Sequence, residues 1–327
     1  MPITPHRPRV LCMADLSSAP EALETLRRVA EVDYLPPDRA KLMETLHLYD
    51  ALWTEFTMKL DREALSGGTR LRAVNTASTG TDHIDKDLLA ERGIRLLCIK
   101  NDLGLLDQFT ATAECGWMLL LCCARRMRRC IEVSLSDSWA AREELRGRQL
   151  SGLTLGVLGV GRLGKMTVEY GKAFRMRVLA CDLKDFHIAG VERVSFETLL
   201  READAVCVHI HLTKENHNLF DAEALARMKP GAILVNTSRG DIVDEGALIA
   251  ALESGRLAAY GADVVHDEWR ANMGESRLIQ YARANPGKVV MTPHIGGNTD
   301  FSVRAARIFS ARKLAHFLET GQELALV

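Results

Sequence analysis

The sequence of 327 residues lacks a hydrophobic run that could cross a membrane. Its longest apolar run, WMLLLCCA at 117–124, is far shorter than the roughly 20 residues of a membrane helix. The N-terminal segment also lacks the apolar core and the small-residue cleavage site of a signal peptide. These absences predict a soluble protein of the cytoplasm, with no membrane partner.

The chain also lacks an excess of charge, because 42 basic and 43 acidic residues give a net charge of −1. It therefore has no global basic field of the kind that attracts nucleic acid, and we expect no nucleic-acid partner. The one basic cluster, ARRMRR at 124–129, lies at the end of a helical pattern. Cations are favourable there, at the negative end of the helix dipole.

The eight cysteines form no C-x-x-C pair. Most of them lie inside apolar strand or helix segments, which is typical of reduced, buried thiols in a cytosolic protein. We therefore expect neither disulfides nor a metal site.

Short apolar segments alternate with helical segments along nearly the whole chain. Continuous apolar strands in such an alternation predict parallel sheets that helices cover on both faces, so the fold class is α/β. The length suits two domains, each with its own series of strands. The first series is 9–15, 48–54, 71–77 and 94–100, and the second is 153–160, 177–182, 204–210, 232–238, 259–265 and 288–293.

Two long helical patterns stand outside these series. The segment 111–129 predicts one long helix, which suits a helix that bridges two domains or lies in a subunit interface. The segment 300–321 predicts a last helix that ends at Gly321, a residue favoured at helix C-termini. Because it follows the second series, we expect it to return to the first domain.

The segment LTLGVLGVGRLGK places Gly159, Gly161 and Gly164 directly after a strand and at the start of a helix. The first glycine permits a tight turn, the second lets backbone amides approach a pyrophosphate, and the third lets helix and strand pack closely. Asp182 follows at the end of the next strand, where a carboxylate accepts hydrogen bonds from ribose hydroxyls and repels a 2′-phosphate. The pattern therefore predicts NAD as the cofactor.

Three later strand ends each carry polar residues: Arg239, then Asp263 with Glu268, and finally His294. Ligands bind at the carboxyl ends of parallel strands, so these side chains are expected to converge on the cofactor. Such a set suits reduction of a 2-oxo acid. A guanidinium offers paired donors to the substrate, and a histidine held by a carboxylate can protonate the carbonyl.

The whole chain resembles the D-isomer-specific 2-hydroxy acid dehydrogenase family. The match rests on GVLGVGRLGK, HIHLTKENHNLF, MKPGAILVNTSRGDIVDEGALIAAL and TPHIGG, in that order. The resemblance implies a flavodoxin-like and a dinucleotide-binding domain, both Rossmann-like, with the active site in the cleft between them, and a homodimer. Residues 1–101 and 297–327 would form the substrate domain, and residues 102–296 the NAD-binding domain.

The resemblance also implies roles for individual residues. Arg239 would bind and polarise the substrate, His294 would be the acid/base, and Glu268 would orient His294. Asp182 would contact the ribose and Asp263 the nicotinamide amide. The implied cofactor-binding residues are Thr79, Gly159, Gly161, Arg162, Leu163, Gly164, Asp182, Ile210, Thr237, Ser238, Asp263, Gly296 and Gly297, and the implied substrate-binding residues are Ser78, Thr79, Gly80 and Arg239.

The sequence departs from the family pattern at Val265, where an aromatic is common, at Trp269, where proline is usual, and at His211, which replaces a proline. Trp269 puts the shape of the loop after Glu268 in question. The predicted function is interconversion of a small D-2-hydroxy acid and its 2-oxo acid. The alternatives are a dinucleotide-sensing scaffold like the C-terminal binding protein corepressors and a short phosphoglycerate dehydrogenase. A formate dehydrogenase is disfavoured because that branch has glutamine at the position of Glu268.

Overall fold

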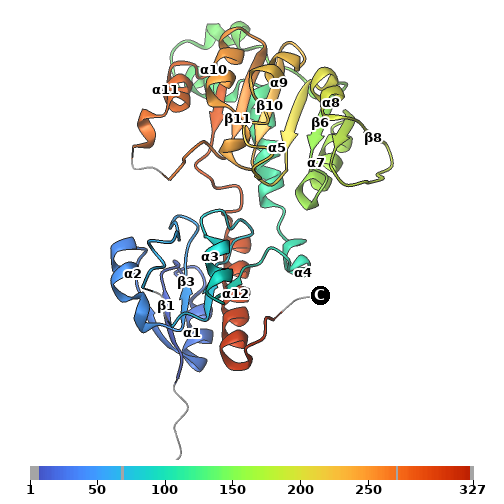
Figure 1. Cartoon of the computed structure of the whole chain (residues 1–327). Helices are drawn as coiled ribbons and strands as arrows, with labels where there is room; N and C mark the ends of the chain where they lie inside the picture. The colour runs from blue at the N-terminus through green and yellow to red at the C-terminus, as the bar shows by residue number, and fades with distance from the viewer. Residues whose placement is uncertain (1–6, 68–69, 270–271, 325–327) are drawn as a thin grey trace, which may run out of the picture. The chain divides into compact units, whose positions relative to one another are not determined.

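Two parallel sheets organise the chain in the computed structural model, which describes residues 7–67, 70–269 and 272–324 (Figure 1). The first unit comprises the chain up to Phe109 and from Thr299 onward, and the second unit is Thr110–Asn298. The α/β class with two parallel-sheet domains is confirmed. The assignment of residues 1–101 and 297–327 to a substrate domain, and of residues 102–296 to an NAD-binding domain, stays a prediction.

The sheet of the first unit has the strand order β2-β1-β3-β4-β5 with every pair parallel. Alternation along β1 gives it two apolar faces: Val10 and Cys12 pack on one side, and Leu11 and Met13 on the other. The strands are β1 (Arg9–Cys12), β2 (Glu31–Tyr34), β3 (Ala51–Trp53), β4 (Ala73–Asn75) and β5 (Arg95–Leu97). The helices are α1 (Pro20–Val29), α2 (Arg39–Thr45), α3 (Lys86–Glu91), α4 (Leu103–Leu106) and α12 (Asp300–Thr320).

Helix α12 belongs to the first unit, as expected, and packs against α1. The Thr299 side chain caps its first turn, and Gly321 ends it in the left-handed conformation at φ 74°. Its buried Lys313 donates to the Asp102 carboxylate over 2.7 Å and to the Cys98 carbonyl over 2.8 Å. Both charged side chains are 2% exposed, so this ion pair belongs to the core that fixes α12.

The sheet of the second unit has the order β12-β11-β10-β9-β6-β7-β8, again with every pair parallel. The strands run in chain order outward in both directions from β6 and β9, so the switch point lies between these two strands. They are β6 (Thr154–Leu158), β7 (Arg177–Cys181), β8 (Val191–Arg193), β9 (Ala205–Val208), β10 (Ala232–Asn236), β11 (Leu257–Ala262) and β12 (Val289–Met291).

Helices cover both faces of this second sheet. Ile233 and Val235 of β10 face one side, whereas Leu234 faces the other. The first side is covered by α5 (Ala111–Ala124) and α7 (Arg162–Ala173), and the second by α8 (Phe196–Glu202), α9 (Ala222–Arg227), α10 (Glu245–Glu253) and α11 (Arg277–Ala284).

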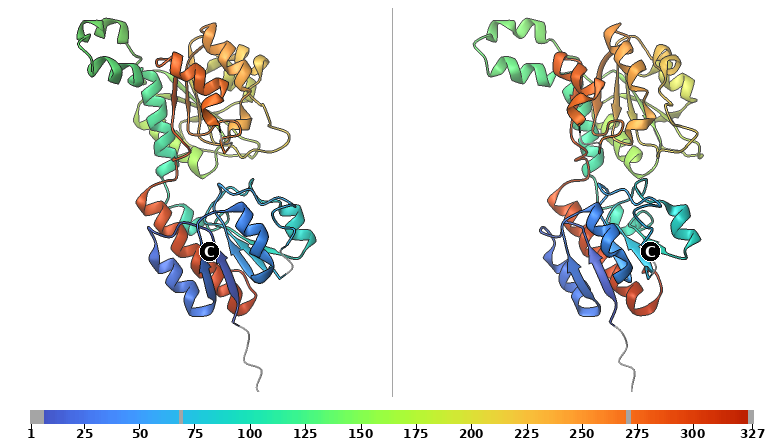
Figure 2. Two further views of the ribbon diagram at one scale, coloured as in Figure 1. Left: turned by 90° about the vertical axis from the view of Figure 1, so that its left-hand side faces the viewer. Right: turned by 60° about the vertical axis from the view of Figure 1, so that its left-hand side comes forward.

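The prediction of one helix over 111–129 is wrong. Helix α5 ends at Ala124, Arg126 takes the left-handed conformation at φ 51°, and α6 (Met127–Ser134) starts in a new direction. Helix α6 and the 3-10 helix η2 (Trp139–Leu145) form an arm, residues 127–145, that projects away from the sheet of the second unit (Figure 2). A non-glycine residue in the left-handed region is uncommon, so the periodicity of the sequence gives no sign of this break.

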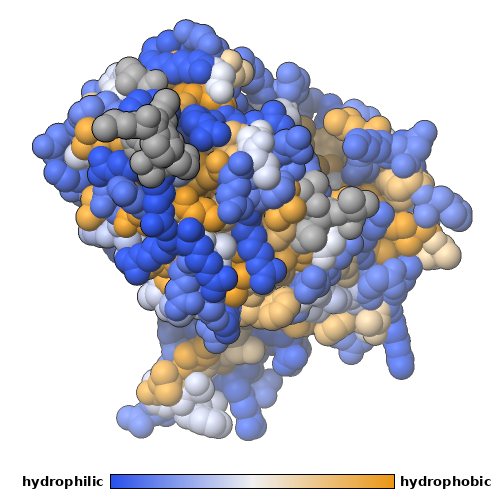
Figure 3. Space-filling view, turned by 90° about the horizontal axis from the view of Figure 1, so that it is seen from below, coloured by the Kyte–Doolittle hydropathy of each residue, from blue (hydrophilic) through white to orange (hydrophobic). Residues whose placement is uncertain are grey.

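Strands β2 and β8 were not predicted, because EVDY and VER are largely polar edge segments without an apolar run. On the face of the molecule in Figure 3, apolar residues are interspersed with hydrophilic ones, as on ordinary globular surfaces. In the described part of the chain no helix combines the length and the apolarity that a membrane crossing requires.

Candidate functional site

The glycine loop joins β6 to α7 at the switch point of the second sheet. Gly159 has a φ of 91°, and a Cβ there would lie 2.6 Å from the carbonyl oxygen of His209. A Cβ on Gly164 would lie 1.9 Å from the Gly159 carbonyl oxygen. Helix α7 can therefore approach the end of β6 this closely only because Gly164 has no side chain. At Gly161, the N-cap of α7, a Cβ would meet nothing within 4 Å. The loop thus leaves space at a helix N-terminus, where an anionic group is stabilised.

Asp182 at the end of β7 holds this loop. One carboxylate oxygen accepts the Val160 N–H over 2.6 Å, and the other accepts the Lys184 N–H over 2.8 Å. Each carboxylate oxygen has a second lone pair, so further hydroxyl donors can still bind. Arg162 and Leu163, the first residues of α7, are half-buried beside the loop. The residues of the glycine loop therefore fit a dinucleotide.

In the sheet order β9 lies directly beside β6, and β10 lies beyond β9. His209 shares a hydrogen bond of 2.9 Å with the Thr167 hydroxyl, and burial lowers its pKa to about 4. It is therefore neutral near pH 7 and links α7 to β9. Thr237 lies against Gly116 of α5. A Cβ added to Gly116 would lie 3.4 Å from the methyl group of Thr237. The Ser238 hydroxyl donates to the Val208 carbonyl over 2.9 Å, whereas Ile210 is half-buried.

Asp263, directly after β11, organises the loop after β12. Its carboxylate accepts the Thr292 hydroxyl over 2.6 Å, the Ile295 N–H over 2.8 Å and the Gly296 N–H over 2.6 Å. Its backbone carbonyl accepts the N–H of His294 over 2.9 Å. A Cβ on Gly296 would lie 2.7 Å from the Asp263 carboxylate, so the glycine permits this approach. A single buried carboxylate thus sets the course of the chain around His294.

His294 has a φ of 54°, a conformation that costs about 1–3 kcal/mol for a residue with a side chain. Its Nδ1 shares a hydrogen bond of 2.6 Å with Glu268, and the two side chains are 27% and 16% exposed. The indole of Trp269 stacks on the imidazole, with ring centroids 5.7 Å apart and an angle of 29° between the planes. The histidine is therefore fixed by its backbone, a carboxylate and an aromatic face.

The loop that carries Arg239 follows β10. Asn236 at the strand end accepts the Ser238 N–H over 2.9 Å and donates to the Arg239 carbonyl over 2.8 Å. A Cβ on Gly240 would lie 2.1 Å from the carbonyl carbon of Val265, so this loop touches the segment that leads to Glu268. The arginine loop and the glutamate loop are therefore in backbone contact.

A second pair joins the same two loops and was not foreseen from the sequence. Asp241 accepts from Nδ1 of His266, and the bond to Asp241 raises the pKa of that histidine. Glu245 also accepts the N–H of His266 over 3.1 Å. A histidine three residues after Asp263 was the available signal, but its partner became identifiable only once β10 and β11 were neighbours.

The predicted residues of the second unit follow the carboxyl ends of β6, β7, β9, β10, β11 and β12, which meet at one edge of the sheet. Ser78, Thr79 and Gly80 belong to the first unit, in the loop after β4. There the Ser78 hydroxyl donates to the Gly80 carbonyl over 2.8 Å and pairs with the Thr76 hydroxyl over 3.0 Å. These contacts give the loop a defined backbone.

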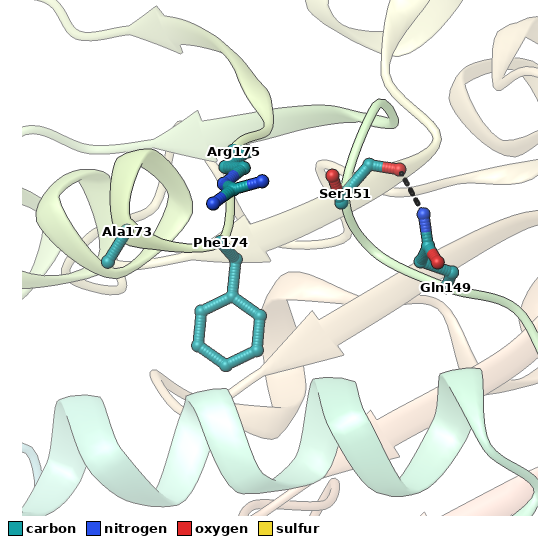
Figure 4. A pocket seen from close by; sticks show the side chains of 5 residues that line it. All are labelled: Gln149, Ser151, Ala173, Phe174 and Arg175. Atoms are coloured by element: carbon teal, nitrogen blue, oxygen red, sulfur yellow. Dashed lines mark hydrogen bonds between the residues drawn. The ribbon is translucent and has the colours of Figure 1, made fainter.

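A recess of about 410 Å³ at the C-terminal end of α7 is a poor candidate (Figure 4). The side chain of Phe174 points toward α5 and packs edge-on against Trp117 with 4.9 Å between ring centroids. The lining offers one charged group, Arg175, and neither a carboxylate nor an imidazole. The lining residues are Gln149, Ser151, Ala173, Phe174 and Arg175.

Comparison with known proteins agrees with this geometry. Residues 117–296 match the NAD binding domain of the D-isomer specific 2-hydroxyacid dehydrogenases. The chain is 38% identical over 285 residues to a glyoxylate reductase of Aeropyrum pernix, and 80% of each chain is covered. It is 32% identical over 285 residues to a hydroxypyruvate reductase of Thermotoga maritima, with 87% of this chain and 89% of the relative covered.

The fold also matches solved structures. One is a D-lactate dehydrogenase of Aquifex aeolicus complexed with NAD and lactic acid, with a TM-score of 0.82 and 28% sequence identity. The match covers 95% of each chain. The likeness therefore extends over both parallel sheets.

Proposed function

Because the chain belongs to the D-isomer specific 2-hydroxyacid dehydrogenase family and uses NAD, we propose that it interconverts a small D-2-hydroxy acid and its 2-oxo acid through Arg239, Glu268 and His294. The predictions of the family, of a dehydrogenase and of NAD are thereby confirmed. The comparisons give no support to the corepressor alternative.

The observation that carries the residue roles is the 2.6 Å contact between His294 Nδ1 and Glu268. In the direction of reduction, NADH held at the glycine loop would supply the hydride for the carbonyl carbon. His294 delivers a proton from its other ring nitrogen, Nε2, to the carbonyl oxygen. Glu268 stabilises the imidazolium and keeps the ring in one orientation. Arg239 binds the substrate carboxylate and polarises the carbonyl through paired N–H donors.

The cofactor contacts of the predicted residues belong to the same proposal. The space beside Gly161 supports pyrophosphate binding there, and Asp182 retains acceptor capacity for ribose hydroxyls. Asp263 is already engaged with three donors of its own chain, which supports a role in holding the His294 loop beside any contact with nicotinamide.

The proposed substrate class is a short 2-oxo acid such as glyoxylate or hydroxypyruvate, since the relatives at 38% and 32% identity carry these names. Backbone amides of Ser78, Thr79 and Gly80 would hold the carboxylate. Trp269 is 48% exposed while it covers His294, so it would form one wall beside the reacting carbonyl.

The test is NADH oxidation with glyoxylate, pyruvate, hydroxypyruvate, phosphohydroxypyruvate, 2-oxobutyrate, phenylpyruvate and 2-oxoglutarate. Arg239→Ala should lower kcat/KM by about 100-fold or more, because charge-assisted paired bonds are lost, while NADH binding is retained. The kcat/KM of Arg239→Lys, which keeps the charge without the paired N–H donors, should lie between the values of the wild type and Arg239→Ala. Undiminished turnover in Arg239→Ala would remove Arg239 from the proposal, and a preference for phosphohydroxypyruvate would favour the phosphoglycerate dehydrogenase alternative.

We also propose a homodimer that the arm helps to form. Its side chains Ile131, Leu135 and Trp139 are 51%, 84% and 67% exposed, which is unusual for large apolar groups. A second copy of the chain would cover them, and Leu135→Asp should shift the mass measured by light scattering from dimer to monomer. A cytoplasmic location agrees with the eight free cysteines, because thiols persist in a reducing compartment.

A further inference from the structure

The basic cluster ARRMRR takes no part in the proposed reaction, yet it contributes to a pocket of about 590 Å³ in the second unit. Five basic side chains line this pocket, which we call the basic pocket. None of its lining residues, all within the described ranges, is acidic. The five cationic residues are Arg126, Arg129, Arg146, Arg148 and Lys288.

The basic pocket lies at the edge of the second sheet opposite to the glycine loop. Its lining includes Ile233 and Ala258, the second residues of β10 and β11, and Lys288, which directly precedes β12. These positions are the amino ends of parallel strands, whereas Arg239, Asp263 and His294 follow the carboxyl ends. The basic pocket is therefore separate from the dinucleotide site.

Carboxylates near the pocket balance its charge only in part, because each one that pairs with a lining arginine also pairs with a second cation. Asp204 is shared by Arg148 at 3.4 Å and Lys229 at 2.7 Å. Glu143 and Glu132 are likewise each shared by two arginines. The arginine pairs are Arg142 with Arg146 on Glu143, and Arg128 with Arg129 on Glu132.

Two of the cations are held by neutral groups. Arg126 donates to the Glu144 carbonyl over 2.7 Å, and Lys288 donates to the Leu252 carbonyl over 3.0 Å. Backbone carbonyls orient these side chains but leave their full charges in place. The pocket therefore has a net positive charge.

Glycines let the backbone form the walls of this pocket. A Cβ on Gly147 would lie 2.7 Å from the Ala124 carbonyl, so only glycine lets the chain return from the arm against the end of α5. A Cβ on Gly287 would lie 3.4 Å from the Arg126 guanidinium, so the guanidinium rests against that turn. These backbone contacts shape the pocket around its arginines, of which Arg126, Arg129 and Arg146 remain exposed to solvent.

We propose that the basic pocket binds a small polyanion of the phosphate-ester class. Gathering five cations costs free energy through mutual repulsion, and a multiply charged anion would offset that cost. Guanidinium forks match the geometry of phosphate oxygens, and four of the five groups are arginines. The volume falls within the usual range of small-molecule sites. This site lies beyond the proposed dehydrogenase chemistry and does not depend on its substrate.

The test is calorimetric titration of the intact protein with inorganic pyrophosphate, with NADH present at saturation so that the glycine loop is filled. We expect saturable binding with one pyrophosphate per chain. Arg126→Gln with Arg129→Gln should weaken it by about tenfold or more, because charge-assisted bonds are lost. The matched control is Arg142→Gln, an arginine of the arm outside the lining, which should change affinity by less than about twofold.

Thermal unfolding and NADH affinity of the double variant should equal those of the wild type, which separates loss of the site from loss of the fold. Two results would overturn the proposal. One is absence of saturable binding, and the other is an equal loss in Arg142→Gln. Where binding is absent, a change of oligomeric state in the double variant would show that a second copy of the chain covers the pocket.

Discussion

Replacing Asp263 with asparagine tests how the His294 loop is held. The carboxylate accepts two donors on one oxygen, from Thr292 and Ile295, and one on the other, from Gly296. Asparagine keeps the size but turns one oxygen into an amide group. The NH2 of that group would face the Gly296 N–H, so that two donors oppose each other. Residue 263 is 2% exposed, so the site is buried from water.

The loss of one charge-assisted bond, with weaker bonds on the other oxygen, should cost about 2–4 kcal/mol. Much of it should appear as easier local opening of the loop, because the chain near His294 has a strained φ of 54°. Amide hydrogen exchange at Ile295 and Gly296 should then accelerate by about 30-fold to 1,000-fold, and kcat should fall with it.

Thr292→Val is the control, because it removes one donor and leaves the carboxylate and both backbone N–H bonds in place. It should cost about 1–2 kcal/mol, clearly less than Asp263→Asn. Equal exchange rates in Asp263→Asn and in the wild type would refute the argument that this carboxylate positions the loop.

Three further predictions concern other parts of the chain. Gly240→Ala would set a Cβ 2.1 Å from the Val265 carbonyl carbon, so it should push the arginine and glutamate loops apart. The variant should lose about 3 kcal/mol or more of its free energy of unfolding in urea and should have a lower kcat; wild-type stability would contradict this contact. Lys313→Met removes the cation that pairs with the buried Asp102 carboxylate and with Glu323. It should destabilise by about 3–5 kcal/mol, most of which Lys313→Met with Asp102→Leu should restore; equal instability of the double variant would argue against an electrostatic cause. Burial lowers the pKa of His209 to about 4, so below a pH of about 6.5 the unfolded chain takes up a proton before the folded chain does. The free energy of unfolding should therefore decline by about 3 kcal/mol as the pH falls from about 6.5 to 4, and this decline should flatten in His209→Asn.

Much of the fold was predictable because its strands are continuous apolar runs. The segment AILVN of β10 is buried at every position, which is typical of a central parallel strand, and its boundaries follow from the turn residues around it. The glycine spacing at Gly159, Gly161 and Gly164 indicated the loop at the switch point, because its requirements are local. The end of α12 at Gly321 was likewise encoded in a single residue.

What escaped prediction depends on contacts between distant residues. The break at Arg126 has no glycine or proline to announce it, and the chain turns there because the arm returns through Gly147 against Ala124. The engagement of Asp263 with the Thr292 hydroxyl requires β11 and β12 to be neighbours in register. The sequence indicated which side chains sit at strand ends, but not which of them bond to one another.

The central claim is that the His294–Glu268 pair donates the proton in reduction of a 2-oxo acid. The most direct measurement is the rate of NADH oxidation with glyoxylate, and with the best other acid of the panel, for the wild type and His294→Gln. We predict saturable turnover by the wild type and a loss of about 100-fold or more in kcat for the variant, with NADH affinity unchanged. Turnover of His294→Gln at the wild-type rate, or a wild type that binds NADH and reduces no 2-oxo acid, would contradict it.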